Sequence, residues 1–402
     1  PTIFTLSNLL KAYVSCRRRK RTTINALKFE LDLEANLLDL QKQLESRTYQ
    51  PKRSICFIVT YPKTREIFAA DFSDRIIHHL LVSEIGPYFE RAFIHNSFAC
   101  RKGKGTHKAV KSLYRSLNKV TKNQTRNAFY GQFDIQSFFT TIDKQVLYEA
   151  IEPKIIRLKK HQAWKDEILY LLKVIIFHNP VDNYVIKGRR ELFGELPPQK
   201  SLFYVHQNKG LPIGNLTSQF FANVYLDYLD QFIKRELKVE YYFRYVDDFV
   251  LFSRNIDEIK KWRNLIGHFL EERLKLKLHP KKDKYGSVYQ GVDFVGYIVK
   301  PDYVLSRKRV VNNLKNKLYF FNQGLLLFSS NQRQKALPLS RPPTKEEIEQ
   351  MTNTVNSYFG HFCQANCYNL RKNLYERHFG ELKNYLKPQE DLRFFRPLEP
   401  AG

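Results

Sequence analysis

The sequence predicts an α+β fold, and three of its properties lead to that prediction. The chain has 402 residues, of which 43% are apolar and 14% aromatic; this is enough for a sizeable core and excludes an intrinsically disordered protein. From Ile55 to Ile298, strand-like and helix-like segments alternate, with Gly and Pro residues between them. After Pro301 the pattern becomes helical. At roughly 150 residues per domain, this length predicts two or three domains.

The first elements expected along the chain are a basic run and a helix. Five basic residues at 17–21 precede a stretch, 24–44, in which Leu and Ile recur near helical spacing. We expect one N-terminal helix there, capped near Thr22 or Thr23. The longest apolar run, Ile168 to Phe177, is interrupted by Lys173 and is far shorter than the roughly 18 residues of a membrane span, so we expect a buried helix.

The C-terminal part is expected to form amphipathic helices joined by an exposed loop. One face of the first helix carries Val311, Leu314, Leu318 and Phe321, and another carries Lys308, Asn312 and Lys315. Residues 331–344 contain three prolines and several basic residues, which predicts a loop.

Charge and cysteine content limit the environment and the partners. The chain carries 67 Lys and Arg against 40 Asp and Glu, a formal charge of +27, which makes nucleic acid the leading partner and an anionic membrane surface the second choice. Residues 1–16 do not resemble a secretory signal, so we expect a cytoplasmic protein. Five cysteines indicate reduced thiols. His361, Cys363 and Cys367 lack a fourth zinc ligand at suitable spacing, which favours ordinary packing.

Three acidic residues stand at the ends of strand-like segments. Asp134 closes the apolar segment that begins at Ala128, and Asp247 and Asp248 lie between two strand-like runs, as in a hairpin turn. Asp is also a common turn residue, which is the simpler reading of the pair. Three carboxylates gathered at one sheet edge would repel one another and raise their own pKa values.

Divalent metal removes that cost, because Mg²⁺ binds carboxylate and phosphate oxygens. Two ions about 3.5 to 4 Å apart activate an attacking hydroxyl and neutralise a leaving pyrophosphate, which is the chemistry of a polymerase. The sequence therefore predicts two Mg²⁺ ions, with Mn²⁺ as a possible substitute, at Asp134, the adjacent Ile135, Asp247 and Asp248.

Several segments between Ile55 and Val299 resemble reverse transcriptases, in the family's order. The segment from Tyr61 to Ile67, followed by Ala70 to Arg75, is similar to the first fingers motif, and this likeness implies that Lys63 and Arg65 hold the incoming triphosphate. Asn96 to His107 is similar to the Gly-rich basic segment along the template, which implies template contacts by Arg101, Lys102 and Lys104.

The palm motifs carry the resemblance further. Gly131 to Ile142 resembles the motif with the first metal ligand, so that Asp134 takes this role and Phe139 falls where an aromatic ring blocks a ribose 2′-OH. The sequence Tyr245-Val246-Asp247-Asp248 resembles the retroelement signature, which makes all three acids catalytic. Leu278 to Lys282 is similar to a segment whose lysine, here Lys282, assists pyrophosphate departure. The likeness assigns the primer grip to Phe294, Val295, Gly296 and Tyr297, within Gly291 to Tyr297, and duplex contacts to Lys308 and Lys315.

This resemblance implies a right-hand polymerase that makes DNA from dNTPs on a template RNA and holds an RNA/DNA duplex. Its expected domains are an N-terminal basic segment and helix at 1–50, fingers at 51–130, a palm with an antiparallel sheet at 131–300 and a helical thumb at 301–402. Fingers helices are expected to be inserted in the palm between about 145 and 209.

The loop from Gly210 to Gln219 indicates a subtype. It carries Ile213 where most relatives have Gln, and Gln219 where many have Pro; with Gly214, these two residues are expected beside the nucleotide. This form resembles reverse transcriptases of diversity-generating retroelements, which are bacterial or phage-encoded, misincorporate opposite template adenines and work with a small basic accessory protein. Antiviral defence enzymes of bacteria share the loop form and stay an alternative. A non-catalytic RNA-binding maturation factor and an RNA-dependent RNA polymerase are the less favoured hypotheses.

Overall fold

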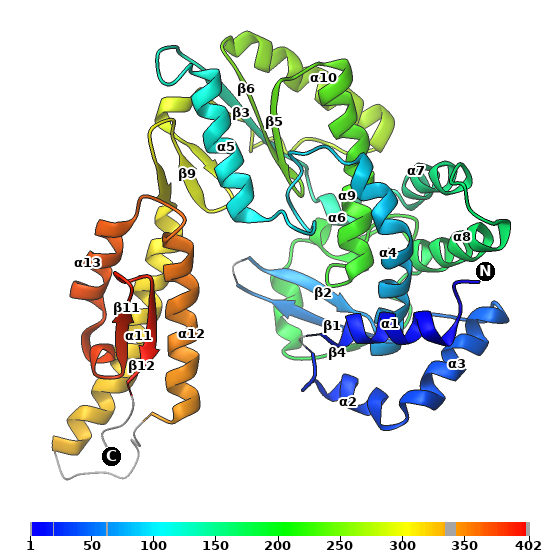
Figure 1. Cartoon of the computed structure of the whole chain (residues 1–402), viewed down its shortest axis with the longest axis horizontal. Coiled ribbons are helices and arrows are strands. Elements are labelled where there is room, and N and C mark those ends of the chain that lie inside the picture. The colour runs from blue at the N-terminus through cyan, green and yellow to red at the C-terminus, as the bar shows by residue number, and fades with distance from the viewer. Residues whose placement is uncertain (1, 19, 62, 334–342, 399–402) are drawn as a thin grey trace. The chain divides into compact units, whose positions relative to one another are not determined.

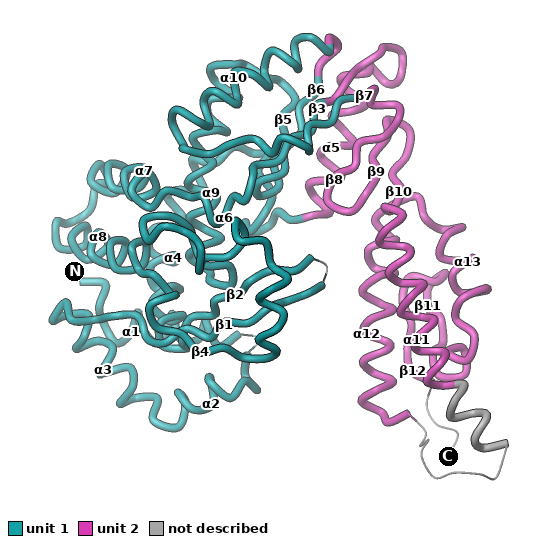
Figure 2. Tube along the Cα trace, turned by 180° about the vertical axis from the view of Figure 1, so that it is seen from behind, with its two compact units in different colours: residues 1–105, 131–252, 256–285 teal, residues 106–130, 253–255, 286–402 magenta. Residues whose placement is uncertain are grey.

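The protein consists of two compact units, described here from a computed structural model. The structure describes all residues except 1, 19, 62, 334–342 and 399–402. Unit 1 comprises residues 1–105, 131–252 and 256–285, and unit 2 comprises residues 106–130, 253–255 and 286–402 (Figure 2). Helices and sheets occur in both units, which confirms the predicted α+β class.

Unit 1 begins with three helices, where the sequence pattern predicted one. They are α1 (Leu6–Arg17), α2 (Ile24–Leu31) and α3 (Leu33–Glu45). The single helix expected over 24–44 is wrong, because Asp32 adopts a non-helical backbone conformation and separates α2 from α3. Helix α1 was not expected. Thr5 caps it, and its buried Leu9, Ala12, Tyr13 and Cys16 share one face.

Further helices of unit 1 surround two sheets (Figure 1). The helices are α4 (Phe72–Ala92), α6 (Phe138–Thr141), α7 (Lys144–Ile156), α8 (Gln162–Phe177), α9 (Leu216–Gln231) and α10 (Ile256–Leu274). Helix α1 packs against α4, which in turn contacts α9. The apolar run in α8 is a largely buried helix, as predicted.

The first sheet holds the predicted fingers segment. It contains β1 (Ser54–Val59), β2 (Arg65–Ala69) and β4 (Tyr184–Ile186), in the order β2-β1-β4. Strands β1 and β2 are antiparallel, with Ile55 opposite Ala69. Cys56 and Phe68 on these strands form a core cluster with Leu202.

The second sheet holds all three predicted acids. Its strands are β3 (Phe129–Asp134), β5 (Tyr241–Tyr245), β6 (Asp248–Ser253) and β7 (Lys284–Ser287), in the order β5-β6-β3-β7. The predicted strand before Asp134 and the predicted hairpin around Asp247 are therefore confirmed. Since β3 lies next to β6, the two acidic segments are neighbours in space.

Unit 2 combines helices with short strands. Its elements are α5 (Thr106–Val120), β8 (Val292–Phe294), β9 (Tyr297–Val299), β10 (Val304–Ser306), α11 (Lys308–Arg333), α12 (Lys345–Phe362), α13 (Tyr368–His378), β11 (Leu386–Gln389) and β12 (Phe394–Pro397). Leu314 and Leu318 of α11 are buried in its core, as their helical face predicted. The region after 301 is not purely helical, because β11 and β12 form a hairpin that packs on α12. The loop expected at 331–344 lies largely outside the described residues.

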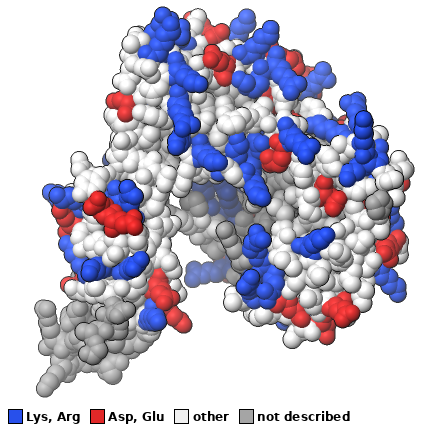
Figure 3. All heavy atoms as spheres, viewed as in Figure 1, with Lys and Arg blue, Asp and Glu red and all other residues white. Residues whose placement is uncertain are grey.

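The cysteine and histidine side chains considered for zinc have different surroundings in unit 2. The His361 ring stacks on Tyr297, with ring centroids 4.0 Å apart, and Cys367 is buried in the core. Cys363 is partly exposed. Figure 3 shows Lys and Arg side chains distributed over the visible face of each unit, with acidic side chains between them. No helix in the described part of the chain is long and apolar enough to cross a membrane.

Candidate active site

The turn between β5 and β6 presents Asp247 on a strained loop. Tyr245 lies opposite Asp248 in the register, so the loop consists of Val246 and Asp247 alone. Val246 has a φ of 57°, in the left-handed region that β-branched residues avoid at a cost of about 1–2 kcal/mol. The surrounding structure must therefore hold this turn in place.

Asp134 lies beside the turn because main-chain contacts join the neighbouring segments. The amide of Ile135 donates to the carbonyl of Asp247 at 3.3 Å. The amide of His279 donates to the carbonyl of Asp134 at 2.8 Å, which fixes the segment that carries Lys282. Lys282 Nζ then lies 2.6 Å from Asp134 Oδ1. The structure thus brings together three residues that are far apart in the sequence: Asp134, Asp247 and Lys282.

The electrostatics of Asp247 reflect this proximity. Burial and, to a smaller extent, the negative charge of Asp134 raise the pKa of Asp247 to about 6, although the positive charges of Lys282 and Arg65 act in the opposite direction. Two acids that sit close together beside cations are a typical feature of a site that handles polyanionic substrates.

Asp248 has a hydrogen-bond partner that the sequence pattern did not indicate. The side-chain amide of Gln132, on β3, donates to its carboxylate, with Nε2 at 3.0 Å from Oδ1 and 3.3 Å from Oδ2. Gln132 and Asp248 are 116 residues apart, so no local pattern signals this pairing. Gln132 is buried and adds a positioning group to the acidic site.

The donor chemistry of the acidic residues fits a divalent cation. Carboxylate oxygens are the ligands that Mg²⁺ prefers. The raised pKa of Asp247 means that its ionised form is disfavoured in this site, and a bound cation would stabilise that form. Among the described residues, no three His, Cys, Asp or Glu side chains are gathered closely enough to hold a metal ion as they stand. Asp134 is paired with Lys282 and Asp248 with Gln132, so metal binding would exchange these contacts.

The loop predicted beside the nucleotide packs on β2. The amide of Phe68 donates to the carbonyl of Ile213 at 3.0 Å, and the amide of Ala70 donates to Asn215 Oδ1 at 3.1 Å. Gly214 has a φ of 126°, and a Cβ there would lie 2.9 Å from the Cγ2 atom of Ile67. This close approach requires glycine. Asn215, which holds the loop, was not among the residues predicted from the sequence.

The other residues predicted to bind the nucleotide differ in how far they are exposed to solvent. Lys63 and Arg65 are exposed around the start of β2, and Gln219 is exposed on α9. Phe139 on α6 is partly buried, whereas Phe138 beside it belongs to the core. The carbonyl of Phe139 accepts a hydrogen bond from the amide of Leu211 at 2.8 Å, which joins α6 to the loop that contains Ile213.

The predicted template segment contains one residue that differs from the expected surface cation. The side chain of Arg101 is only 5% exposed, and it binds Glu90 as well as the carbonyls of Ile94 and Ser97. Lys102 is exposed. Lys104 donates to the carbonyl of His95 at 2.8 Å. Template contacts by these residues stay a prediction, and Arg101 is better placed to support the segment from within.

The residues predicted for primer and duplex belong to unit 2. Strands β8 and β9 form a hairpin with Phe294 opposite Tyr297, and its loop residues Val295 and Gly296 both have positive φ. Phe294 and Tyr297 are buried, so the loop is the accessible part. Lys308 is exposed and Lys315 is partly buried on α11. The primer grip and the duplex contacts stay predictions.

Comparison with known proteins agrees with the sequence resemblance. The family model described as reverse transcriptase (RNA-dependent DNA polymerase) matches residues 51–299. Protein YkfC of Escherichia coli strain K12 is 22% identical over 308 residues, which cover 68% of this chain and 74% of that protein.

Among solved structures, apo telomerase from Candida tropicalis, truncated from its C-terminal domain, has a TM-score of 0.47 and 13% identity, with 64% of this chain covered. Telomerase from Candida albicans, in complex with a TWJ fragment of telomeric RNA, has a TM-score of 0.44 and 12% identity, with 84% of this chain covered. The chain spans 55% and 61% of the lengths of these telomerase chains.

Proposed function

The chain belongs to the reverse transcriptase family, and on that premise we propose that it is an RNA-directed DNA polymerase that extends a primer with dNTPs. The observation that carries the proposal is the contact between the end of β3, where Asp134 lies, and the Asp247 turn at the start of the neighbouring strand β6, beside Lys282 and Arg65. Acids and cations arranged in this way suit a reaction in which a hydroxyl attacks a triphosphate.

The proposed mechanism assigns a task to each group of residues. Asp134, Asp247, Asp248 and the main chain of Ile135 would hold two Mg²⁺ ions, or Mn²⁺ in their place. When bound, these ions lower the pKa of the primer 3′-hydroxyl and neutralise charge on the pyrophosphate. Lys63 and Arg65 bind the triphosphate oxygens. Lys282 leaves Asp134 and places its ammonium beside the departing pyrophosphate.

Phe139 supports the choice of deoxynucleotides. Its ring is partly exposed on α6, and its main chain is fixed to the loop of Ile213. An aromatic ring beside the sugar leaves no room for a 2′-hydroxyl. We therefore favour DNA synthesis over RNA synthesis, and the ratio of dNTP to NTP incorporation tests this choice directly.

The subtype that we propose is a diversity-generating retroelement enzyme of bacterial or phage origin, acting in the cytoplasm on a dedicated template RNA. Ile213 supports this proposal, because an apolar side chain at that position cannot hydrogen-bond to a base. The enzyme would then discriminate less strongly between correct and incorrect nucleotides. An accessory protein would complete the system. Antiviral defence is the alternative. Sequencing cDNA made on a defined RNA distinguishes the two, since errors concentrated at template adenines support diversification and evenly spread errors refute it.

Primer extension on an RNA template tests the polymerase activity. The wild-type protein should extend the primer with dNTPs and Mg²⁺, and Asp134→Asn should not. Asp39→Asn, on the exposed surface of α3, is the matched control and should retain activity. If the wild type binds RNA but fails to extend a primer with every cofactor and partner supplied, the non-catalytic maturation factor becomes the better hypothesis.

A further inference from the structure

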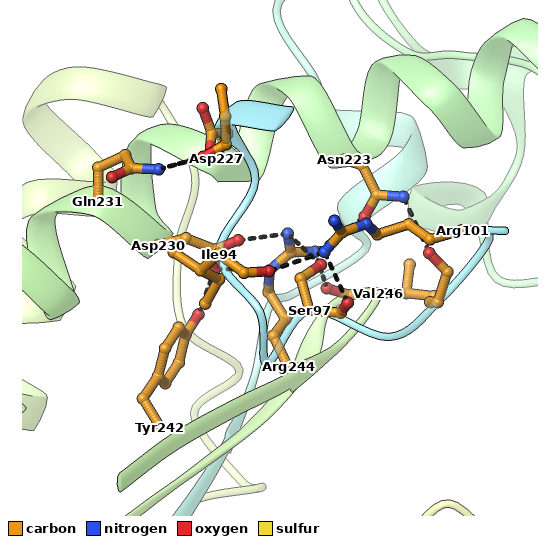
Figure 4. Close-up of polar contacts among 12 residues, drawn as sticks. Ile94, Ser97, Arg101, Asn223, Asp227, Asp230, Gln231, Tyr242, Arg244 and Val246 are labelled. Carbon is orange, nitrogen blue, oxygen red and sulfur yellow. Dashed lines mark hydrogen bonds and ion pairs between the residues drawn. The ribbon is translucent and has the colours of Figure 1, made fainter. Parts of the chain in front are cut away.

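Arg244, on β5, has no role in the chemistry described so far, although its position is unusual. Its side chain is 1% exposed, and it is the largest fully buried side chain in the described part of the protein. A guanidinium group in the interior loses its hydration, so the fold keeps it there only with several partners. Figure 4 shows these partners converging on it from three segments of unit 1.

The main partner of Arg244 is Asp230 on α9. Arg244 Nε lies 2.7 Å from Asp230 Oδ1, and a terminal nitrogen lies 2.6 Å from Asp230 Oδ2, which makes the pair bidentate. The hydroxyl of Tyr242 also donates to Asp230 Oδ1, at 2.7 Å. A buried ion pair adds little net stability by comparison with apolar residues of similar volume, so stability alone is a weak reason for this cluster.

The other side-chain donors of Arg244 reach the turn between β5 and β6 and the segment predicted to contact the template. Nη1 lies 3.0 Å from the carbonyl oxygen of Val246, and Nη2 lies 3.0 Å from Ser97 Oγ. The main chain of Arg244 also pairs with this segment, since its amide donates to the carbonyl of Asn96 at 3.0 Å. One side chain therefore links α9, the turn and the start of the template segment.

The contact with Val246 matters because of where it falls in the turn. Val246 holds the strained left-handed conformation, and the next carbonyl, that of Asp247, accepts from the amide of Ile135. The turn is thus fixed by Arg244 at Val246 and by Ile135, the residue after β3, at Asp247. Without the guanidinium, we expect Val246 to relax to a negative φ, as β-branched residues usually have. This change in the turn would move the Asp247 carboxylate away from Asp134.

We propose that Arg244 is a positioning residue, which holds the carbonyl of Val246 and thereby directs the Asp247 carboxylate toward Asp134. Asp230 orients the guanidinium for this task. The proposal rests on the proposed polymerase function for its catalytic consequence. Its structural consequence, the rigidity of the turn, does not depend on any activity.

Two variants separate positioning from simple stabilisation. The first is a triple variant that combines Arg244→Met, Asp230→Leu and Tyr242→Phe. It replaces the charged pair and its tyrosine hydroxyl by apolar side chains, so that neither charge of the pair is left buried without its partner. In the second, Arg244→Lys keeps the charge beside Asp230 but loses the planar fork that reaches Val246 as well. The control is Glu167→Gln, because Glu167 is a buried carboxylate that binds Thr2 and the amide of Ile3, remote in sequence from the turn.

The measurements are thermal unfolding, hydrogen exchange of the peptide covering residues 245–250, and kcat with its Mg²⁺ dependence. The triple variant should unfold at a temperature close to that of the wild type, yet exchange faster in this peptide. Its kcat should fall roughly 100-fold with RNA binding unchanged, because a displacement of about 1 Å has effects of that size. It should also need more Mg²⁺ for half-maximal rate. Arg244→Lys should share these losses, and Glu167→Gln should lower only the unfolding temperature.

The possible outcomes distinguish this proposal from the proposed function. Wild-type exchange and kcat in the triple variant would overturn the positioning role and leave the polymerase proposal intact. An inactive wild type, combined with faster exchange at the turn in the variants, would overturn the polymerase proposal and support the hold of Arg244 on the turn. If Arg244→Lys fails to fold, the triple variant still decides, since its core is apolar.

Discussion

Asp247→Asn should stabilise the metal-free protein while it abolishes DNA synthesis. The folded structure raises the pKa of Asp247 from 3.8 to about 6 through burial and the charge of Asp134. At about 1.4 kcal/mol per pKa unit, the ionised carboxylate costs at most roughly 3 kcal/mol of unfolding free energy. Because the side chain is partly exposed, solvent reduces this figure, and we expect a gain of about 1–2 kcal/mol at neutral pH.

The pH dependence follows from the direction of the shift. An acid whose pKa is higher in the folded state destabilises the fold as it ionises, so the cost appears between about pH 4 and pH 6 and is complete above that range. The advantage of Asp247→Asn over the wild type should therefore vanish near pH 4 and be largest near neutral pH.

Urea unfolding with EDTA across this pH range measures the effect, with Asp39→Asn as the surface control. Added Mg²⁺ should then stabilise the wild type and leave Asp247→Asn nearly unchanged, because binding to the folded state alone shifts its stability. If the variant were less stable than the wild type at neutral pH, or if its advantage did not depend on pH, the electrostatic account of Asp247 would be refuted.

Three further predictions concern other residues of the candidate site. Lys282→Met removes a positive charge that lowers the pKa of Asp247, so the acidic limb of the pH–rate profile should move to higher pH; an unmoved limb would show that another group controls it. Phe139→Ala should shift the kcat/KM preference toward ribonucleotides by roughly tenfold or more, and an unchanged preference would place the selection elsewhere. Gly214→Ala should cost about 2 kcal/mol or more in urea unfolding, because Ala is strained at its φ of 126° and meets Ile67; a smaller loss would show that the loop adapts.

Much of the acidic site is predictable from the sequence because its elements are local. The strand that ends at Asp134 and the two strands around Asp247 each appear as a short run of β-favouring residues, and two residues between paired strands leave only a tight turn. The N-terminal helices show the limit of such patterns. The apolar spacing continues from α2 into α3, and only the backbone conformation of Asp32 ends the first helix.

The sequence by itself determined which residues we propose for the chemistry of this protein, since the three acids, the Gly214 loop and the excess of positive charge are visible in its order and composition. The tertiary structure decided which of them meet. Lys282 reaches Asp134 across 148 residues, and Gln132 reaches Asp248 across 116. The side chain of Arg101 is only 5% exposed, and Arg244 holds the turn through partners on other segments. Such pairs depend on how strands and helices pack. Removing a charge from water costs free energy, so a buried charge is kept only where partners from distant segments surround it.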